Sequence, residues 1–202
     1  RKTKSEKPII GKSKAMSSSP ETNPILNNPY EEPQSYYATN LAGELDYEKI
    51  MPGRRIFTGS AMPIPTRQGQ QPDLIGPEQM TEHANRIPNL CRKEVRAWRD
   101  AGYPDTTRVT KDLLDFWFNN PERENFLRMF FAQREAVETA IWLNEIAERS
   151  NPGNNILREL EKARKITQDS ADLLPRTAFK MATGTGKTVV MAALTIYHFL
   201  NR

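Results

Sequence analysis

The sequence predicts an α/β protein in which a mostly helical N-terminal region leads into one strand, a glycine-rich turn and a final helix. Helical spacing of apolar residues begins after Pro77 and recurs up to about Gln168. Near the end, the short apolar run Thr177–Met181 precedes a turn with two glycines, and the longer apolar run Val189–Leu200 follows it. A short run, a glycine turn and a long run are typical of a strand followed by a helix.

Composition sets the broad class. The 202 residues allow one or two domains, and the polar excess lies in roughly the first 80 residues. No apolar run reaches about 18 residues, so we expect no membrane span, and no secretory signal is visible. The single cysteine, Cys91, fits a reducing cytoplasmic setting and favours a packing role over catalysis. The net charge of +4 permits a polyanionic partner without establishing one.

The first 78 residues are predicted to be largely irregular. Residues 1–22 mix Lys and Arg with Ser, Thr and Pro, which predicts a disordered basic tail. Such a tail can touch nucleic acid non-specifically, but a solvated tail without a specific role is favoured. Residues 23–78 are rich in Pro and Gly, with a hairpin predicted between Ser35–Thr39 and Leu45–Ile50. Residues 61–77 are predicted as a linker.

One basic pair follows the predicted hairpin. Arg54 and Arg55 come directly after Pro52-Gly53. Two adjacent cations at a turn are more often solvated than bound to a phosphate. We therefore expect a solvated turn here.

Residues 79–125 are predicted as a helical N-terminal region. A short helix over 78–86 is interrupted near Pro88, and Asn89 caps a second helix that ends at Gly102. A third helix covers Thr107–Phe118. Its aromatic residues and those of the second helix favour core packing. Basic and acidic residues are interspersed, which favours packing on the rest of the protein over a DNA contact.

Residues 126–202 hold the features that point to chemistry. A helix is predicted over 125–149, with Val137, Ala140, Ile141 and Asn144 on one stripe. Asn151-Pro152-Gly153 breaks it, and a further helix runs from Asn155 to about Gln168. The chain ends at Arg202, one helix beyond the glycine turn, and begins with Arg1. We expect it to be the N-terminal part of a larger protein.

The glycine turn predicts a phosphate-binding loop. Its sequence is Ala-Thr-Gly-Thr-Gly-Lys-Thr over 182–188. Gly184 and Gly186 let backbone N–H groups turn toward phosphate oxygens, and the following helix adds the positive end of its dipole. Lys187 reaches the β- and γ-phosphates of ATP, and the Thr188 hydroxyl ligates Mg²⁺. Thr183 and Thr185 complete the loop.

The loop departs from the commonest pattern, because Met181 stands where the first glycine belongs. It therefore resembles motif I of superfamily 2 helicases and translocases. The segment Phe130–Val137, Phe-Phe-Ala-Gln-Arg-Glu-Ala-Val, resembles the glutamine motif of the same motors. Gln133 has a carboxamide that can pair with both N6 and N7 of adenine, so it would select ATP over GTP. The alternative is a solvated helix glutamine.

The resemblance is closer to the Res subunit of type III restriction enzymes. It is carried by Phe130–Leu143 and Phe179–Thr188, with softer matches at Asn28–Pro33 and Val95–Pro104. It implies a RecA-like ATP-binding lobe, with Lys187 as the catalytic lysine and ATP and Mg²⁺ as cofactors. It also implies translocation on double-stranded DNA, a methyltransferase or specificity subunit as partner, and an endonuclease in the full-length protein.

Two other functions remain open at this point. One is a different superfamily 2 DNA or RNA helicase, and the other is a scaffold that binds a nucleotide without hydrolysing it. Hydrolysis needs an acidic residue for Mg²⁺ and a group that orients water, and in such folds both follow the loop. We expect the isolated 202 residues to be inactive.

Overall fold

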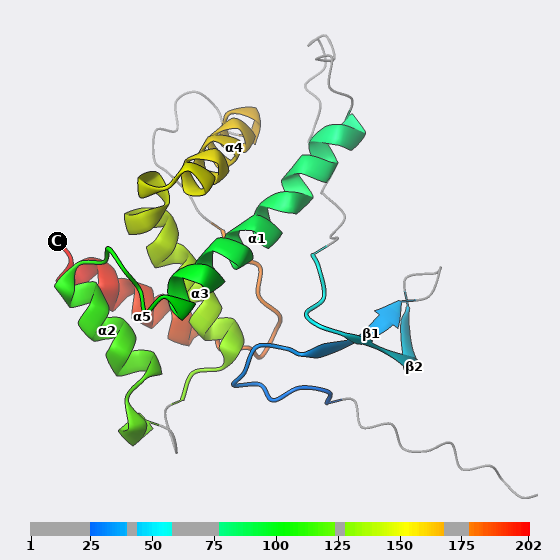
Figure 1. Cartoon of the computed structure of the whole chain (residues 1–202), viewed down its shortest axis with the longest axis horizontal. Coiled ribbons are helices and arrows are strands. Elements are labelled where there is room, and N and C mark those ends of the chain that lie inside the picture. Colours follow the sequence, from blue (N-terminus) through cyan, green and yellow to red (C-terminus); the bar gives the residue numbers. More distant parts are fainter. Residues whose placement is uncertain (1–24, 40–43, 58–76, 124–127, 168–177) are drawn as a thin grey trace, which may run out of the picture.

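The computed structural model describes residues 25–39, 44–57, 77–123, 128–167 and 178–202, with backbone alone for 77–85 and 163–167. This part of the chain is mainly helical with one small antiparallel sheet (Figure 1). Its elements, in chain order, are β1 Ser35–Thr39, β2 Leu45–Pro52, α1 Pro77–Asp100, α2 Arg108–Phe118, η1 Pro121–Arg123, α3 Phe131–Ile141, η2 Trp142–Ile146, η3 Ala147–Arg149, α4 Asn151–Thr167 and α5 Lys187–Leu200.

The two strands form the hairpin that the sequence predicted. They pair antiparallel with Ser35 opposite Pro52 and Thr39 opposite Leu45, and the register shifts between Tyr37 and Ala38. The predicted tail over 1–22 and most of the predicted linker lie outside the described residues. The hairpin lies at one end of the molecule and the helices gather at the other (Figure 1).

The predicted strand before the glycine loop is wrong for the residues that are described. Residues 178–181 have no strand assignment, and Thr177 lies outside the described part. A strand needs a neighbour to share its backbone hydrogen bonds, and no described segment pairs with this one. The helix after the loop is present as α5.

Helix α1 is continuous where the sequence predicted two helices. Pro88 lies inside it, which removes one backbone hydrogen bond. Asn89 does not cap a helix, because its amide accepts from Phe57 N and donates to Phe57 O, both at 2.9 Å. Cys91, Val95 and Trp98 are buried along the next turns. Burial of these three side chains offsets the hydrogen bond that is lost at Pro88. Tertiary packing therefore outweighs the local tendency of proline to end a helix.

The later helices begin at different residues from those predicted. Helix α3 starts at Phe131, after residues 124–127 that lie outside the described part. It runs into the π-helical turn η2 and the short η3. Helix α4 starts at Asn151, four residues early, because Ser150 Oγ accepts from Gly153 N and a proline is tolerated in a first turn. Gly153 also lies against η3, where a Cβ would be 2.1 Å from Ala147 O.

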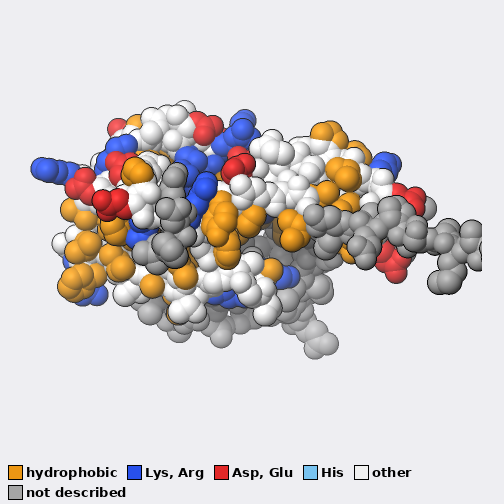
Figure 2. Space-filling model, turned by 90° about the horizontal axis from the view of Figure 1, so that it is seen from below, with side chains coloured by type: hydrophobic (Ala, Val, Ile, Leu, Met, Phe, Trp, Pro, Cys, Tyr) orange, Lys and Arg blue, Asp and Glu red, His pale blue; other side chains and the backbone are white. Residues whose placement is uncertain are grey.

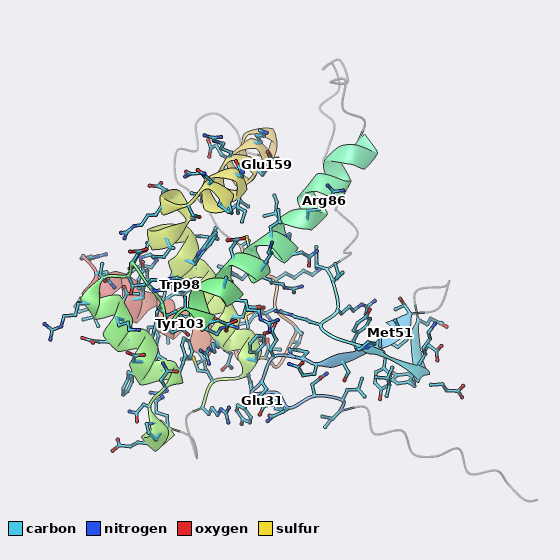
Figure 3. The ribbon with its side chains drawn as sticks, in the orientation of Figure 1. Glu31, Met51, Arg86, Trp98, Tyr103 and Glu159 are labelled. Atoms are coloured by element: carbon cyan, nitrogen blue, oxygen red, sulfur yellow. The ribbon has the colours of Figure 1, made fainter. Side chains whose placement is uncertain are left out.

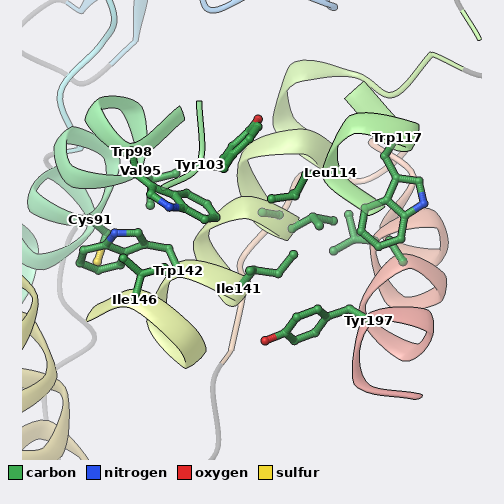
Figure 4. Close-up of a cluster of buried hydrophobic side chains, with 14 of the residues drawn as sticks. Cys91, Val95, Trp98, Tyr103, Leu114, Trp117, Ile141, Trp142, Ile146 and Tyr197 are labelled. Carbon is green, nitrogen blue, oxygen red and sulfur yellow. The ribbon is translucent and has the colours of Figure 1, made fainter. Parts of the chain in front are cut away.

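The core is formed by α1, α2, α3, η2 and α5 (Figure 4), with Ala147 of η3 and Ile156 of α4 added to it. The predicted stripe on α3 is buried at Val137 and Ile141, whereas Asn144 is exposed and donates to Tyr197 Oη at 2.9 Å. Trp98 and Tyr103 lie side by side (Figure 3), with ring centroids 4.8 Å apart. Trp98 is a core residue as predicted, and Tyr103, in the turn after α1, is buried as well. Phe116, which was also expected in the core, is 51% exposed.

Some apolar side chains remain on the surface. Figure 2 shows them near both ends of the face seen from below, with Lys and Arg side chains among them. They include Phe116 on α2 and Tyr47 and Ile50 on β2. Among the described helices, none has the length and apolarity needed to cross a lipid bilayer.

Candidate functional site

The glycine loop folds back on a single carbonyl. Thr185 donates to Ala182 O through its backbone N–H at 3.4 Å and through its hydroxyl at 2.7 Å. Gly184 and Gly186 have φ angles of 80° and 75°. Both lie in the left-handed region, where a side chain is strained, so the turn needs glycine at each position. Helix α5 begins directly after Gly186.

The loop presents backbone donors without protein partners. Within the described residues, the N–H groups of Gly184, Gly186, Lys187 and Thr188 donate to no protein acceptor. They stand at the N-terminus of α5, where the helix dipole is positive. Most of the loop is exposed to solvent. A cluster of free N–H groups at a helix start fits a phosphate group.

Lys187 adds a full positive charge to this cluster. Its side chain lies across the loop, and Nζ donates to Ala182 O at 2.9 Å. A neutral carbonyl leaves the ammonium charge uncompensated, so an anionic oxygen is a better partner. Thr188 is exposed at the first turn of α5. Its hydroxyl is the candidate ligand for a Mg²⁺ ion that accompanies a triphosphate.

Gln133 lies against the loop, and its side chain is 5% exposed. Its Nε2 donates to Thr185 O at 2.9 Å, and its Oε1 accepts from Phe130 N at 3.0 Å. A Cβ on Gly186 would be 2.2 Å from Gln133 Nε2, which shows how closely they pack. The alternative of a solvated glutamine is therefore wrong. Adenine recognition by Gln133 stays a prediction, because each polar atom already has one protein partner.

An aromatic pair beside Gln133 was not predicted. The ring of Tyr30 lies 5.3 Å from that of Phe130, and the guanidinium of Arg128 lies 5.1 Å from the Tyr30 ring centroid. Phe131 N donates to Pro29 O at 2.8 Å, which fixes this segment to the start of α3. Both rings are about one-third exposed. The sequence analysis noted Asn28–Pro33 for its resemblance to Res subunits, but the contact of Tyr30 with Phe130 could not be predicted from the sequence.

A buried carboxylate holds α3 in place, and the sequence analysis missed it. Glu138 is fully buried and accepts from Arg99, Arg134 and Tyr103. Burial and then the Glu138 charge raise the pKa of Tyr103 well above its usual range. Burial lowers the pKa of Arg99 and Arg134, but hydrogen bonds to Glu138 outweigh it and raise both. A glutamate in an amphipathic helix gives no sequence signal that separates it from a solvated one.

No acidic cluster accompanies the loop in the part of the chain that the structure describes. None of its groups of His, Cys, Asp or Glu has three members placed to hold a metal ion. The loop donors fit a triphosphate, and Thr188 offers one oxygen for a cation. Comparison of the chain with protein-family models, curated proteins and solved structures finds no match.

Proposed function

We propose that this chain is the ATP-binding part of an ATP-dependent DNA translocase or helicase of a restriction endonuclease. The observation that carries the proposal is the set of four N–H groups in the loop and at the start of α5 that have no acceptor among the described residues, beside the Lys187 ammonium. When ATP is bound, these groups hold its phosphates and Lys187 moves from Ala182 O to the β- and γ-phosphate oxygens. Thr183 and Thr185 flank the phosphates.

The remaining parts of the function rest on the motifs in the sequence. Double-stranded DNA as the track, a methyltransferase or specificity partner and an attached endonuclease follow from the resemblance to type III Res subunits. A cytoplasmic location follows from the single cysteine. The same motifs are compatible with another superfamily 2 helicase. A scaffold that binds ATP without hydrolysis is the alternative from another class, and measurable ATP turnover by the full-length protein would exclude it.

Gln133 has two roles in this proposal. It ties α3 to the loop through Thr185 O, and its second amide hydrogen and second oxygen lone pair remain for adenine. Tyr30 and Phe130 lie at the same end of α3 and offer aromatic surface next to it. Replacement of Gln133 by Ala should weaken ATP binding and reduce discrimination against GTP. Equal affinity of the wild type for ATP and GTP would contradict the adenine role.

Titration of a fluorescent ATP analogue in the presence of Mg²⁺ tests the central claim. We expect Lys187→Ala to weaken binding at least about tenfold, because one charge-assisted contact is lost. The matched control is Lys180→Ala, which removes an exposed lysine seven positions earlier. It should change the affinity less than about twofold. Equal losses in the two variants would show general charge attraction and would reject the phosphate loop.

In the full-length protein, the same substitution gives a second test. Lys187→Ala should abolish ATP turnover, because the lysine also stabilises charge on the transferred phosphoryl group. Turnover at the wild-type rate would exclude Lys187 as a catalytic residue. The 202-residue chain itself should show no turnover, since the described residues contain no group of three His, Cys, Asp or Glu side chains placed to hold a metal ion.

A further inference from the structure

A shallow pocket lies beside the hairpin, away from the glycine loop. Its volume is about 410 Å³, within the range of small-ligand sites. Its lining residues include Tyr36, Tyr37, Arg54, Arg55 and Arg92. Two of them, Arg54 and Arg92, contact Glu135 on α3. Each residue of a helix turns about 100°, so the side chains at 133 and 135 lie on nearly opposite faces of α3. Gln133 contacts the loop, and Glu135 contacts the arginines of the pocket.

The pocket has more positive than negative charge. Arg54 is neutralised, because it forms a two-pronged pair with Glu135 and lies 3.6 Å from Glu32. Among the described residues, the carboxylate contact of Arg92 is a 3.9 Å approach to the same Glu135. Arg55 is exposed and has no carboxylate partner among the described residues. Two guanidinium groups are therefore left for an outside anion.

The electrostatic environment of Arg92 agrees with this. Burial lowers the pKa of Arg92, and the nearby charge of Arg54 lowers it further. Glu135 opposes these effects but is already bound by Arg54. An anion bound between Arg54 and Arg92 would offset the repulsion between their positive charges. Planar guanidinium groups are well suited to phosphate oxygens.

Aromatic surface continues from the pocket along the hairpin. Tyr36 and Tyr37 line the pocket, and the Tyr37 ring lies 5.0 Å from that of Tyr47 at 63°. Tyr47 is 49% exposed. Sites for single-stranded nucleic acid usually combine two features. Cationic side chains contact the sugar-phosphate backbone, and neighbouring aromatic rings stack on the bases. An isolated inorganic phosphate would need no such rings.

We propose that this pocket binds a phosphate of single-stranded DNA through Arg55 and Arg92, with the adjoining base against Tyr47. The choice of DNA over RNA rests on the proposed function, in which the track is double-stranded DNA. The choice of a single strand rests on the exposed ring of Tyr47, and the phosphate site rests on the arginines alone. The sequence analysis favoured a solvated turn at Arg54 and Arg55. The two arginines differ in their contacts. Arg54 links the hairpin to α3 through Glu135, whereas Arg55 is exposed at the pocket and available to bind a ligand.

Fluorescence anisotropy with a labelled 12-residue oligothymidylate tests the site on the whole chain, without ATP. Arg55→Glu should weaken binding at least about fivefold, and Arg55→Glu with Arg92→Gln by more than about tenfold. The matched control, Arg158→Glu, changes the same charge at an exposed position of α4, far from the hairpin (Figure 1). It should change affinity less than about twofold. Because Arg55 pairs with no residue in the part of the chain that the structure describes, its substitution should leave the melting temperature unchanged.

Three outcomes would overturn the proposal. Equal losses for Arg55→Glu and Arg158→Glu would show that net charge alone attracts DNA. Tyr47→Ala without effect would remove the stacking contact. Displacement of the oligonucleotide by thymidine monophosphate at the same nucleotide concentration would identify a site for free nucleotides instead of a strand. Lys187→Ala should retain DNA binding, so failure of the ATP proposal and failure of this one are distinguishable.

Discussion

Arg99 of α1 and Glu138 of α3 form a two-pronged ion pair, in which Arg99 Nε donates to Glu138 Oε1 at 3.0 Å and Nη2 donates to Oε2 at 2.5 Å. Glu138 is fully buried, and it also accepts from Arg134 and from Tyr103 Oη. The pair joins the N-terminal helix to the helix that carries Gln133. The position of Gln133 against the loop therefore depends on a contact that lies on another face of α3.

Removal of the Glu138 charge should destabilise the fold strongly. Glu138→Gln leaves Arg134 without a carboxylate among the described residues and leaves Arg99 only its 3.9 Å contact to Glu32. Breaking a buried pair costs about 3–5 kcal/mol. Glu159→Gln is the control, because Glu159 forms an exposed pair with Lys162 on α4 and should cost less than about 1 kcal/mol. Urea unfolding measures both. A change at Glu138 no larger than that at Glu159 would contradict a structural role for the pair.

Gly186 and Gln133 should be energetically coupled. A Cβ at Gly186 would be 2.2 Å from Gln133 Nε2, whereas a Cβ at Gly184 meets no atom within 4 Å. Gly184→Ala should cost about 1–2 kcal/mol from its left-handed φ alone. Gly186→Ala should cost more, and part of that cost should disappear in a Gln133→Ala background. A double-mutant cycle by thermal unfolding tests this, and strict additivity would argue against the contact.

Gly153 should resist the substitution that normally stabilises a helix. An alanine in a helix is about 1 kcal/mol more favourable than glycine. At Gly153, however, a Cβ would be 2.1 Å from the backbone oxygen of Ala147. We expect Gly153→Ala to lower the free energy of unfolding by about 2 kcal/mol or more. The control Asn155→Ala, at an exposed position of the same helix, should change it by less than about 0.5 kcal/mol. A stabilised Gly153→Ala variant would mean that α4 does not pack against η3 this closely.

Cys91 should be a slow nucleophile in the folded chain. Burial raises the pKa of its thiol to about 11. Iodoacetamide at pH 9 should react much more slowly with the folded protein than with the same protein in urea, since the thiolate is the reactive form. Because the chain has a single cysteine, the reaction reports on this site alone. Equal rates in the two states would place Cys91 on the surface.

The same shift predicts how stability changes with pH. The folded thiol ionises at a higher pH than the unfolded thiol, so the unfolded state loses its proton first. The stability contributed by the protonated thiol is fully present below about pH 9 and is lost as the pH rises toward 11. Cys91→Ala should flatten this part of the profile. Urea unfolding at pH 8 and pH 10.5 provides the comparison.

Several local features were predictable because they depend on short-range physics. The strands at Ser35–Thr39 and from Leu45 onward follow from β-branched and aromatic residues flanked by turn residues. The helix that ends at Phe118 follows from its threonine cap and its apolar period. The turn around Gly184 and its helix follow from residue types that tolerate a left-handed backbone and then favour a helix.

Other features needed the tertiary structure because they depend on residues far apart in the chain. Pro88 should end a helix by local rules, yet α1 continues because the buried stripe beyond it is packed and Asn89 is bound to Phe57. The strand predicted before the loop is absent because no described segment pairs with it. No local rule placed Tyr30 against Phe130.

The amino-acid sequence alone predicted which groups of the loop are available for a phosphate, since glycines, a lysine and a threonine in that order supply backbone N–H donors, an ammonium and a hydroxyl. Only the tertiary structure decided that Gln133 is buried against that loop and that Glu138 forms ion pairs with two arginines. It also separated Arg54, which is bound to α3, from Arg55, which is not. Side-chain charge and backbone preference are local properties that the sequence specifies directly. The partner of a charged side chain depends on how the helices and strands pack together.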